Sequence, residues 1–272
     1  MITFLEHRIG DRRVTRLIRK WLNAGVMDDG SWTDTGLGTP QGAIVSPTLA
    51  NVFLHHVLDM WFQKAWRPKV PEGQAIIIRY ADDFVVGFQH KRDAERCLRD
   101  LRDRLARFGL TLHPDKTRLV EFGRFAEANR RRRGAGKPET FDFLGFTHYC
   151  TTTRKGRFRL GRKPIAKRMN RSLARIDEML RNRWHHDIWE VGGWLGQVYN
   201  GWLNYFAVPG SSRFTRVFRR RLQRLWMKAL RRRSQRHRFD WKRMERMTEI
   251  LWPRASIRHP WPDRRFAVKH PR

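Results

Sequence analysis

Acidic residues are scarce in this sequence. The 272-residue chain has 26 Asp and Glu against 58 Lys and Arg, so its net charge is +32. Such a charge opposes compaction by self-repulsion unless a polyanion neutralises it, which argues against an ordinary small-metabolite enzyme. Most of the basic residues are arginines, whose planar guanidinium group suits phosphates and base edges. We therefore expect a nucleic-acid partner.

Cysteine and long apolar runs are also scarce. Cys97 and Cys150 are the only cysteines and have no CxxC spacing, so the sequence predicts neither a disulfide framework nor a zinc site. The longest apolar run covers 75–78, whereas a bilayer span needs about 20 residues. The N-terminus also lacks a signal-peptide core. We therefore expect no membrane partner and a cytoplasmic location.

The pattern of apolar residues predicts an α+β fold. An apolar period of three to four residues indicates helices, and two β-prone runs around a tight turn indicate a hairpin. Basic charge is concentrated after Thr140 and a low-complexity arginine loop at 130–136 marks the main change in composition. The expected helices are 4–23, 44–61, 93–108, 165–182, 188–206, 213–233 and 241–251, and the expected strands are 76–80, 84–88, 110–113, 119–122 and 141–147.

Two adjacent carboxylates, Asp82 and Asp83, stand at the predicted hairpin tip. At a separation of about 4 Å they would repel each other by about 1–4 kcal/mol, and a divalent cation would remove this repulsion. Mg²⁺ prefers a few carboxylates together with phosphate oxygens and water, so the pair suits two-metal phosphoryl transfer. The alternative is that aspartate is simply a common turn residue.

Further motifs flank this pair in a fixed order. The pair itself belongs to a Tyr-x-Asp-Asp motif, Tyr80–Asp83, which follows Thr39-Pro40-Gln41-Gly42. Pro114-Asp115-Lys116-Thr117 and Phe143-Leu144-Gly145-Phe146 come after it. In this order the sequence resembles the palm of reverse transcriptases, specifically the group II intron reverse transcriptase/maturase family. Residues 200–206, Asn-Gly-Trp-Leu-Asn-Tyr-Phe, resemble the thumb signature of that family.

The resemblance implies a partial right-hand polymerase palm with an antiparallel sheet at 1–150. It further implies an α-helical thumb and maturase domain at 151–252 and an extended basic tail at 253–272. The implied function is RNA-directed DNA synthesis by two-metal nucleotidyl transfer with Mg²⁺, together with binding of intron RNA to assist splicing. The implied partners are group II intron RNA, an RNA template, a DNA primer and dNTPs.

The resemblance also assigns roles to single residues. Asp82 and Asp83 become the metal-binding and catalytic carboxylates, and Lys116 lies near the incoming triphosphate; a solvated surface lysine is the alternative for Lys116. A lysine there could stabilise or protonate the leaving pyrophosphate. The template and nucleotide contacts are Pro40, Gln41, Gly42, Tyr80 and Ala81, and the primer grip contains Leu144 and Gly145. Each group has an alternative interpretation. Gln41 and its glycine-flanked loop could be a plain helix-entry turn, Tyr80 an ordinary strand aromatic, and Leu144 and Gly145 part of a bulged strand.

Two arginine clusters in the basic part are the expected RNA contacts. They comprise Arg219, Arg220, Arg221, Arg231, Arg232 and Arg233. Each neutralised phosphate would steepen the salt dependence of binding by about 0.9 log units per log unit of salt. A solvated basic helix face is the alternative.

One departure from the family pattern limits these expectations. The palm of the family uses another aspartate from a strand that should precede Phe4, so we expect a truncated protein whose two-metal site lacks one carboxylate ligand. The open alternatives are a non-catalytic RNA-binding splicing cofactor and an inactive fragment. A second copy of the chain or a complementing N-terminal segment also stays open as a partner.

Overall fold

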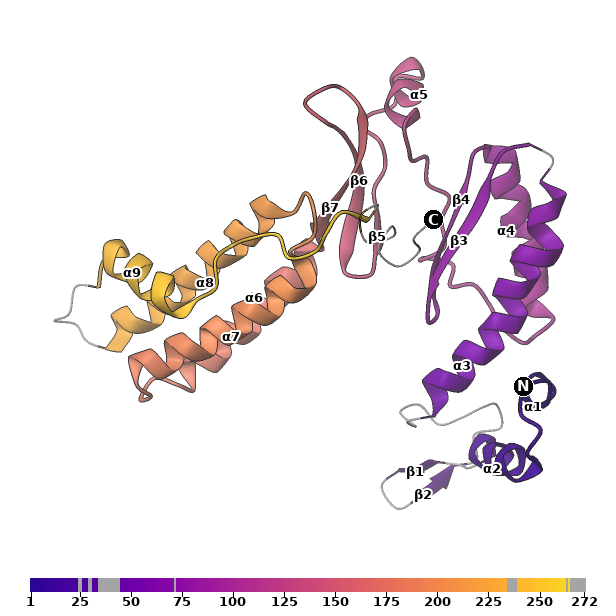
Figure 1. Cartoon of the computed structure of the whole chain (residues 1–272), viewed down its shortest axis with the longest axis horizontal. Helices are drawn as coiled ribbons and strands as arrows, with labels where there is room; N and C mark the ends of the chain where they lie inside the picture. Colours follow the sequence, from indigo (N-terminus) through magenta and orange to yellow (C-terminus); the bar gives the residue numbers. More distant parts are fainter. Residues whose placement is uncertain are drawn as a thin grey trace. The chain divides into compact units, whose positions relative to one another are not determined.

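A computed structural model describes residues 1–23, 26–28, 31–33, 45–70, 72–233, 239–262 and 264. They form a mixture of helices and small antiparallel sheets (Figure 1), which confirms the α+β class. The chain divides into two compact units, Met1–Leu119 and Val120–Arg272. The family domains expected at 1–150, 151–252 and 253–272 stay a prediction.

The first unit opens with two helices rather than one. The helix predicted over 4–23 is wrong because the structure has α1 at Ile2–Glu6 and α2 at Arg12–Leu22. Between them, the carboxylate of Asp11 accepts a 2.7 Å hydrogen bond from the backbone N–H of Arg13 and caps the start of α2. A short antiparallel pair follows, β1 at Val26–Asp28 and β2 at Ser31–Thr33.

A long helical stretch leads to the hairpin. It comprises α3 at Ser46–Leu54, two π-helical segments, η1 at His55–Asp59 and η2 at Trp61–Trp66, and the 3₁₀ turn η3 at Arg67–Lys69. The hairpin strands β3, Ala75–Tyr80, and β4, Asp83–Phe88, pair antiparallel. Helix α4, Lys91–Ala106, follows and ends just before Gly109, whose φ of +69° suits the stop predicted there. Val57, Leu58, Leu101 and Leu105 are buried together, and Ile77 and Phe84 pack against them.

Two predicted strands are absent from the described structure. Neither 110–113 nor 119–122 forms a strand, because their backbone groups bond elsewhere. The N–H of Leu110 donates to the carbonyl of Leu105 at the end of α4, and the N–H of Glu121 donates to the carboxylate of Glu139. These β-prone residues therefore form no strand in the described structure.

The second unit begins with a helix and a three-stranded sheet. Helix α5, Ala126–Arg132, contains the first three residues of the loop predicted at 130–136, so that prediction is wrong for 130–132, whereas 133–136 form no helix or strand. Arginine is a good helix former and a basic last turn favours the helix dipole. Strands β5, Phe141–Phe143, β6, Phe146–Thr152, and β7, Phe158–Pro164, pair antiparallel in the order β5-β6-β7.

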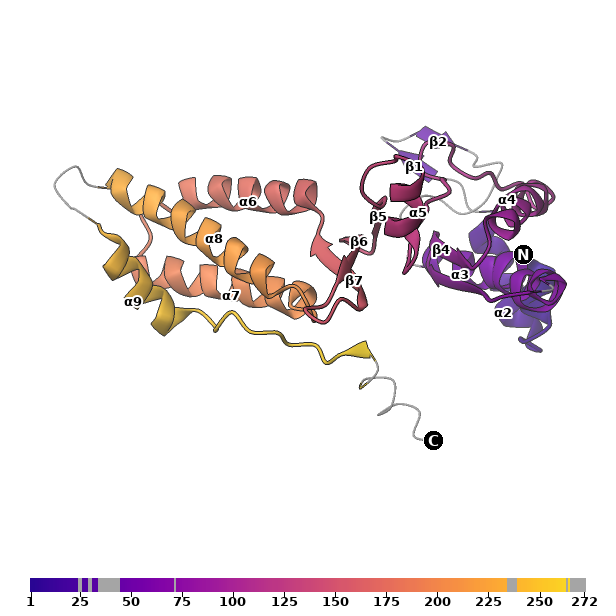
Figure 2. The same ribbon diagram turned by 90° about the horizontal axis from the view of Figure 1, so that it is seen from above.

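Four helices complete the second unit (Figure 2). They are α6 at Ala166–Arg181, α7 at Ile188–Phe206, α8 at Ser212–Arg233 and α9 at Trp241–Leu251, close to their predicted bounds. Asp187 and Asp240 cap α7 and α9 by accepting hydrogen bonds from backbone N–H groups of the first turn. The residues 253–261 that follow contain no helix or strand. Among the helices of the described ranges, none is long and apolar enough to span a bilayer.

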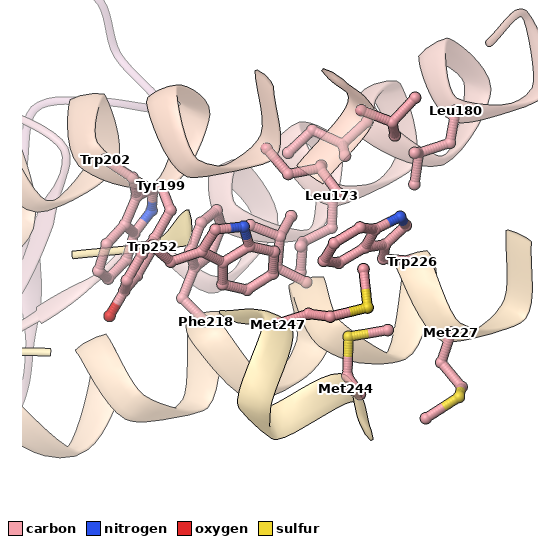
Figure 3. Close-up of a cluster of buried hydrophobic side chains, with 14 of the residues drawn as sticks. Leu173, Leu180, Tyr199, Trp202, Phe218, Trp226, Met227, Met244, Met247 and Trp252 are labelled. Carbon is pink, nitrogen blue, oxygen red and sulfur yellow. The ribbon is translucent and has the colours of Figure 1, made fainter. Parts of the chain in front are cut away.

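The four helices enclose an aromatic and methionine-rich core (Figure 3). Tyr199, Trp226 and Met244 are fully buried in it, and Trp202 stacks on Phe218 with ring centroids 4.3 Å apart. The tryptophans of the second unit before residue 242 divide into three groups. Trp202 and Trp226 are buried, Trp194 and Trp241 pack against the core, and Trp184 and Trp189 are exposed.

Candidate functional site

Asp82 and Asp83 lie at the tip of the β3–β4 hairpin, as predicted. Tyr80 pairs with Asp83 across the hairpin, so only Ala81 and Asp82 form the turn between the strands. Both carboxylate residues are exposed. The sequence therefore places two adjacent carboxylates on a short turn that is held by a six-residue ladder.

The exposed face of the hairpin is largely apolar. Side chains of a strand alternate between two faces, so Ile76, Ile78 and Tyr80 share one of them. They are 53%, 55% and 67% exposed, respectively. Asp83 lies on the same face because it is the ladder partner of Tyr80. The opposite face of β3 contains Ile77 and is covered by the helices.

The backbone of the turn is strained at Ala81. Its φ is +54°, in the left-handed region that costs a residue with a Cβ atom about 1–2 kcal/mol. The carbonyl of Ala81 accepts a 2.8 Å hydrogen bond from Nη1 of Arg79. Backbone strain of this kind concentrates at functional sites and persists only where the surroundings hold it.

Arg79 is held in turn by residues of the preceding helical stretch. Its Nε and Nη2 donate to the two carboxylate oxygens of Asp59 at 2.8 and 2.7 Å, and Nη1 donates to Oδ1 of Asn51 at 2.8 Å. Burial alone would raise the pKa of the Asp59 carboxyl, but the hydrogen bonds and charge of Arg79 outweigh it and lower the pKa below its ordinary value. The roles of Arg79 and Asp59 were not predicted from the sequence. The available signal was an arginine on the helix-covered face of an otherwise apolar strand.

The donor set at the turn fits part of a magnesium site. Mg²⁺ takes hard oxygen ligands and is commonly held by one or two carboxylates, with water and phosphate oxygens completing the octahedron. Asp82 and Asp83 offer such carboxylates at an exposed turn. Within the described ranges, no group of three or more His, Cys, Asp or Glu side chains could hold a metal ion together.

The remaining predicted residues of the first unit are only partly described. Lys116 is exposed on a turn in which the N–H groups of Lys116 and Thr117 both donate to the carbonyl of His113. The predicted template and nucleotide contacts Pro40, Gln41 and Gly42 lie outside the described residues.

Leu144 and Gly145 form a second strained turn, between β5 and β6. Phe143 pairs with Phe146, so these two residues make up the whole turn, with φ values of +47° and +78°. The hydroxyl of Tyr205 in α7 donates a 2.9 Å hydrogen bond to the carbonyl of Leu144. The expected primer grip and the thumb signature are therefore joined within one compact unit. Tyr205 was part of the signature motif, but this contact had no sequence signal.

All but one of the arginines in the two clusters expected to bind RNA already have partners inside the chain. Nη1 and Nη2 of Arg219 donate to the carbonyls of Pro253 and Thr248 at 2.8 and 3.0 Å. Arg220 pairs with Glu245, and Arg221 donates to the side chain of Asn170. Arg231 and Arg233 donate to the backbone carbonyls of Phe239 and Arg183, respectively.

Other basic side chains of the second unit are free to meet a ligand. Arg232 is exposed and has no hydrogen-bond or ion-pair partner among the described residues. The same holds for Arg213, Arg216 and Arg224 along α8. Helix α6 adds the exposed basic residues Lys167, Arg168, Arg171 and Arg175.

Sequence comparison shows the family to which the chain belongs. The model of the family described as reverse transcriptase (RNA-dependent DNA polymerase) matches residues 4–148, more than half of the chain. The chain belongs to the reverse transcriptase family. The match includes the first three residues of β6, the hairpin with Asp82 and Asp83, and the turn at Leu144 and Gly145.

Intron-encoded proteins, among them one named for a group II intron, are relatives of the chain, which confirms the more specific resemblance. The chain is 47% identical over 57 residues to the uncharacterized 91 kDa protein in the cob intron of Schizosaccharomyces pombe and 40% identical over 57 residues to the group II intron-encoded protein LtrA of Lactococcus lactis. Each alignment covers 21% of the chain. Protein YkfC of Escherichia coli is 28% identical over 147 residues, 42% of the chain. The alignments span 7%, 10% and 37% of these three relatives.

Proposed function

We propose that this chain takes part in RNA-directed DNA synthesis as the portion of a group II intron reverse transcriptase that carries the paired carboxylates. The observation that carries the proposal is the position of Asp82 and Asp83 on a two-residue turn, inside the segment matched by the family. The substrates would be dNTPs, a DNA primer and an RNA template. Intron RNA would be a further partner, bound to assist splicing.

The proposal gives the chain's own residues distinct tasks. Asp82 and Asp83 would hold Mg²⁺, which when bound supplies charge stabilisation for nucleotidyl transfer. Tyr80, which shares the exposed face with Asp83, would lie beneath the primer end, and Lys116 would neutralise or protonate the leaving pyrophosphate. Leu144 and Gly145 would present backbone to the primer strand. In this proposal, the first unit and the β5–β6 turn belong to a palm, and α6–α9 form the thumb and maturase region.

A second candidate is an RNA-binding splicing cofactor without polymerase activity. Exposed arginines of α8 that have no partner among the described residues favour RNA binding, and such binding needs neither Asp82 nor Asp83. This candidate also agrees with the lack of a third metal-binding side chain near the pair among the residues that the structure describes.

Primer extension tests the first candidate against the second. The chain would be assayed on a primed RNA template with Mg²⁺ and dNTPs, alone and together with the fingers and upstream palm strand of a related reverse transcriptase. We expect extension chiefly in the supplemented reaction. Asp82→Asn should abolish it, while RNA affinity stays within about threefold because distant phosphate contacts supply most of that affinity. RNA binding without extension in every supplemented reaction would favour the splicing cofactor.

A control separates loss of a metal ligand from loss of negative charge. Asp103→Asn changes an exposed aspartate of α4 in the same unit, outside the motifs of the family. It removes the same charge as Asp82→Asn and should leave extension nearly unchanged. A supplemented Asp82→Asn protein that still extends the primer would contradict the catalytic assignment.

A further inference from the structure

We propose that Arg79 is a positioning residue that fixes the turn carrying Asp82 and Asp83. Its guanidinium group holds the Ala81 carbonyl of the turn and is itself held by Asp59 and Asn51. The effect of Arg79 on catalysis rests on the proposed function. Its effect on the turn can be measured without any catalytic activity.

The geometry uses every nitrogen of the guanidinium group. Nε and Nη2 meet both carboxylate oxygens of Asp59, a bidentate arrangement that fixes the plane of the group. Nη1 is thereby directed toward two acceptors, Oδ1 of Asn51 and the carbonyl oxygen of Ala81, both at 2.8 Å. The side chains of Arg79 and Asp59 are only 13% and 19% exposed, so this pair is screened less than a surface ion pair.

The bond to Ala81 acts directly on Asp82. The peptide unit between Ala81 and Asp82 is planar, so fixing the carbonyl of Ala81 also fixes the direction of the N–H of Asp82. The direction of the Asp82 side chain then depends only on the backbone φ and the side-chain χ angles of Asp82. The same bond supports the strained φ of +54° at Ala81, which would otherwise relax toward a more common conformation.

The contacts tie the turn to a rigid part of the unit. Asp59 ends η1, whose Val57 and Leu58 are buried against Leu101 and Leu105 of α4. Asn51 lies one helical segment earlier, in α3. The turn is thus braced from two helical segments, in addition to the ladder of β3 and β4. Reacting groups need such bracing because a misplacement of about 1 Å can lower a rate 100-fold.

Lysine cannot replace arginine in this arrangement. An ammonium group keeps the positive charge but cannot contact both oxygens of Asp59 as a planar fork and reach Asn51 and Ala81 at the same time. Arg79→Lys therefore separates the geometric role from the charge. Arg79→Met removes both, and Asn51→Ala removes a single partner of the guanidinium group without touching the turn.

Hydrogen exchange of the 272-residue chain tests the bracing without any activity assay. Amides of the β3–β4 ladder that flank the turn should exchange about 10- to 100-fold faster in Arg79→Met and Arg79→Lys, the change expected for one lost charge-assisted hydrogen bond. Amides of α4 should keep their protection. The matched control is Arg92→Met, because Arg92 is an exposed arginine of the same unit that pairs with Glu72 at 3.3 Å. If Arg79→Met fails to fold, Arg79→Lys and Asn51→Ala decide the question.

Kinetics of the supplemented protein test the catalytic meaning. Arg79→Lys should lower kcat for primer extension about 10- to 100-fold while KM for the dNTP stays within about threefold, because positioning acts on the chemical step. Unchanged exchange of the amides that flank the turn in folded Arg79→Lys and Arg79→Met proteins would overturn the inference, as would faster exchange with an unchanged kcat. If the wild-type protein never extends a primer, the proposed function fails, and the exchange experiment still shows whether Arg79 fixes the turn.

Discussion

The hydroxyl of Tyr205 donates a 2.9 Å hydrogen bond to the backbone carbonyl of Leu144, joining α7 to the β5–β6 turn. The ring of Tyr205 also stacks on Phe146, with centroids 5.8 Å apart and planes inclined by 13°. A Cβ atom at Gly145 would lie 3.3 Å from the ring. The turn expected to meet a primer is thus fitted closely against the helix that carries the thumb signature.

We predict that Tyr205→Phe loosens this turn while leaving the ring stack intact. Loss of the hydroxyl removes one hydrogen bond, so the free energy of unfolding of the second unit should fall by about 0.5–1.5 kcal/mol. Denaturant unfolding followed by tryptophan fluorescence measures this change. Hydrogen exchange at Leu144 and Gly145 should rise as well.

Tyr149→Phe in β6 is the matched control for this prediction. Its hydroxyl has no hydrogen-bond partner among the described residues, so its removal should change the stability by less than about 0.5 kcal/mol. Equal effects of the two substitutions would contradict the role given to the Tyr205 hydroxyl.

We further predict that glycines of α7 differ sharply in their tolerance of alanine. A Cβ atom at Gly196 would lie 2.6 Å from the backbone carbonyl oxygen of Leu251, at the close approach of α7 and α9, whereas a Cβ atom at Gly193 would meet nothing within 4 Å. Gly196→Ala should therefore destabilise the second unit by about 1–3 kcal/mol through overpacking.

Gly193→Ala in the same helix should instead stabilise the unit by up to about 1 kcal/mol, because alanine is the better helix former. Thermal or denaturant unfolding of the two variants measures the contrast. Similar stability of the two proteins would show that α7 and α9 do not approach each other this closely.

The contrast between predicted and observed elements has a physical basis. Helices α6 to α9 could be predicted because their apolar residues recur at helical spacing and Asp187 and Asp240 mark two of their starts. The hairpin could be predicted because its two apolar runs can pair only around Asp82. The break before α2 was missed because the apolar period continues across Gly10 and Asp11, although both residues interrupt helices.

Tertiary contacts account for what remained hidden in the candidate site. The pairing of Arg79 with Asp59 joins residues 20 positions apart, and that of Tyr205 with Leu144 joins residues 61 positions apart. The spacing of apolar residues along the sequence contains no information about contacts between such distant positions. Arg219 is a further example. In the sequence it is one of three adjacent arginines that look equivalent, but in the structure it donates a hydrogen bond to the carbonyl of Thr248 in the last turn of α9.

Thiol labelling should distinguish the two cysteines. Burial raises the pKa of the Cys97 thiol to about 12, so its reactive thiolate is nearly absent in the folded protein up to pH 10, and the side chain is only 3% exposed. Cys150 is partly exposed. We expect a maleimide at pH 7.5 to label Cys150 rapidly and Cys97 only after unfolding, as measured by mass spectrometry of the labelled peptides. Equal rates in the native protein would contradict the burial of Cys97.

The last prediction concerns which arginines of α8 bind RNA. Arg216, Arg224 and Arg232 are exposed and have no partner among the described residues, whereas Arg219 donates to two backbone carbonyls and lies over the rings of Tyr199 and Trp252. Exchanging Arg216, Arg224 and Arg232 for Gln should weaken RNA binding and flatten the salt dependence by about 0.9 log units for each lost phosphate contact on duplex RNA. The stability should change by less than about 0.5 kcal/mol per site.

Arg219→Gln should show the reverse pattern. It leaves the carbonyls of Thr248 and Pro253 without their donor, which should lower the free energy of unfolding by about 1–3 kcal/mol, while the salt slope of RNA binding stays close to that of the wild type. Filter binding over a range of salt concentrations and denaturant unfolding measure both quantities on the same proteins. A flattened slope in Arg219→Gln, with full stability, would instead show that Arg219 leaves its carbonyl partners to contact phosphate, as the sequence alone suggested.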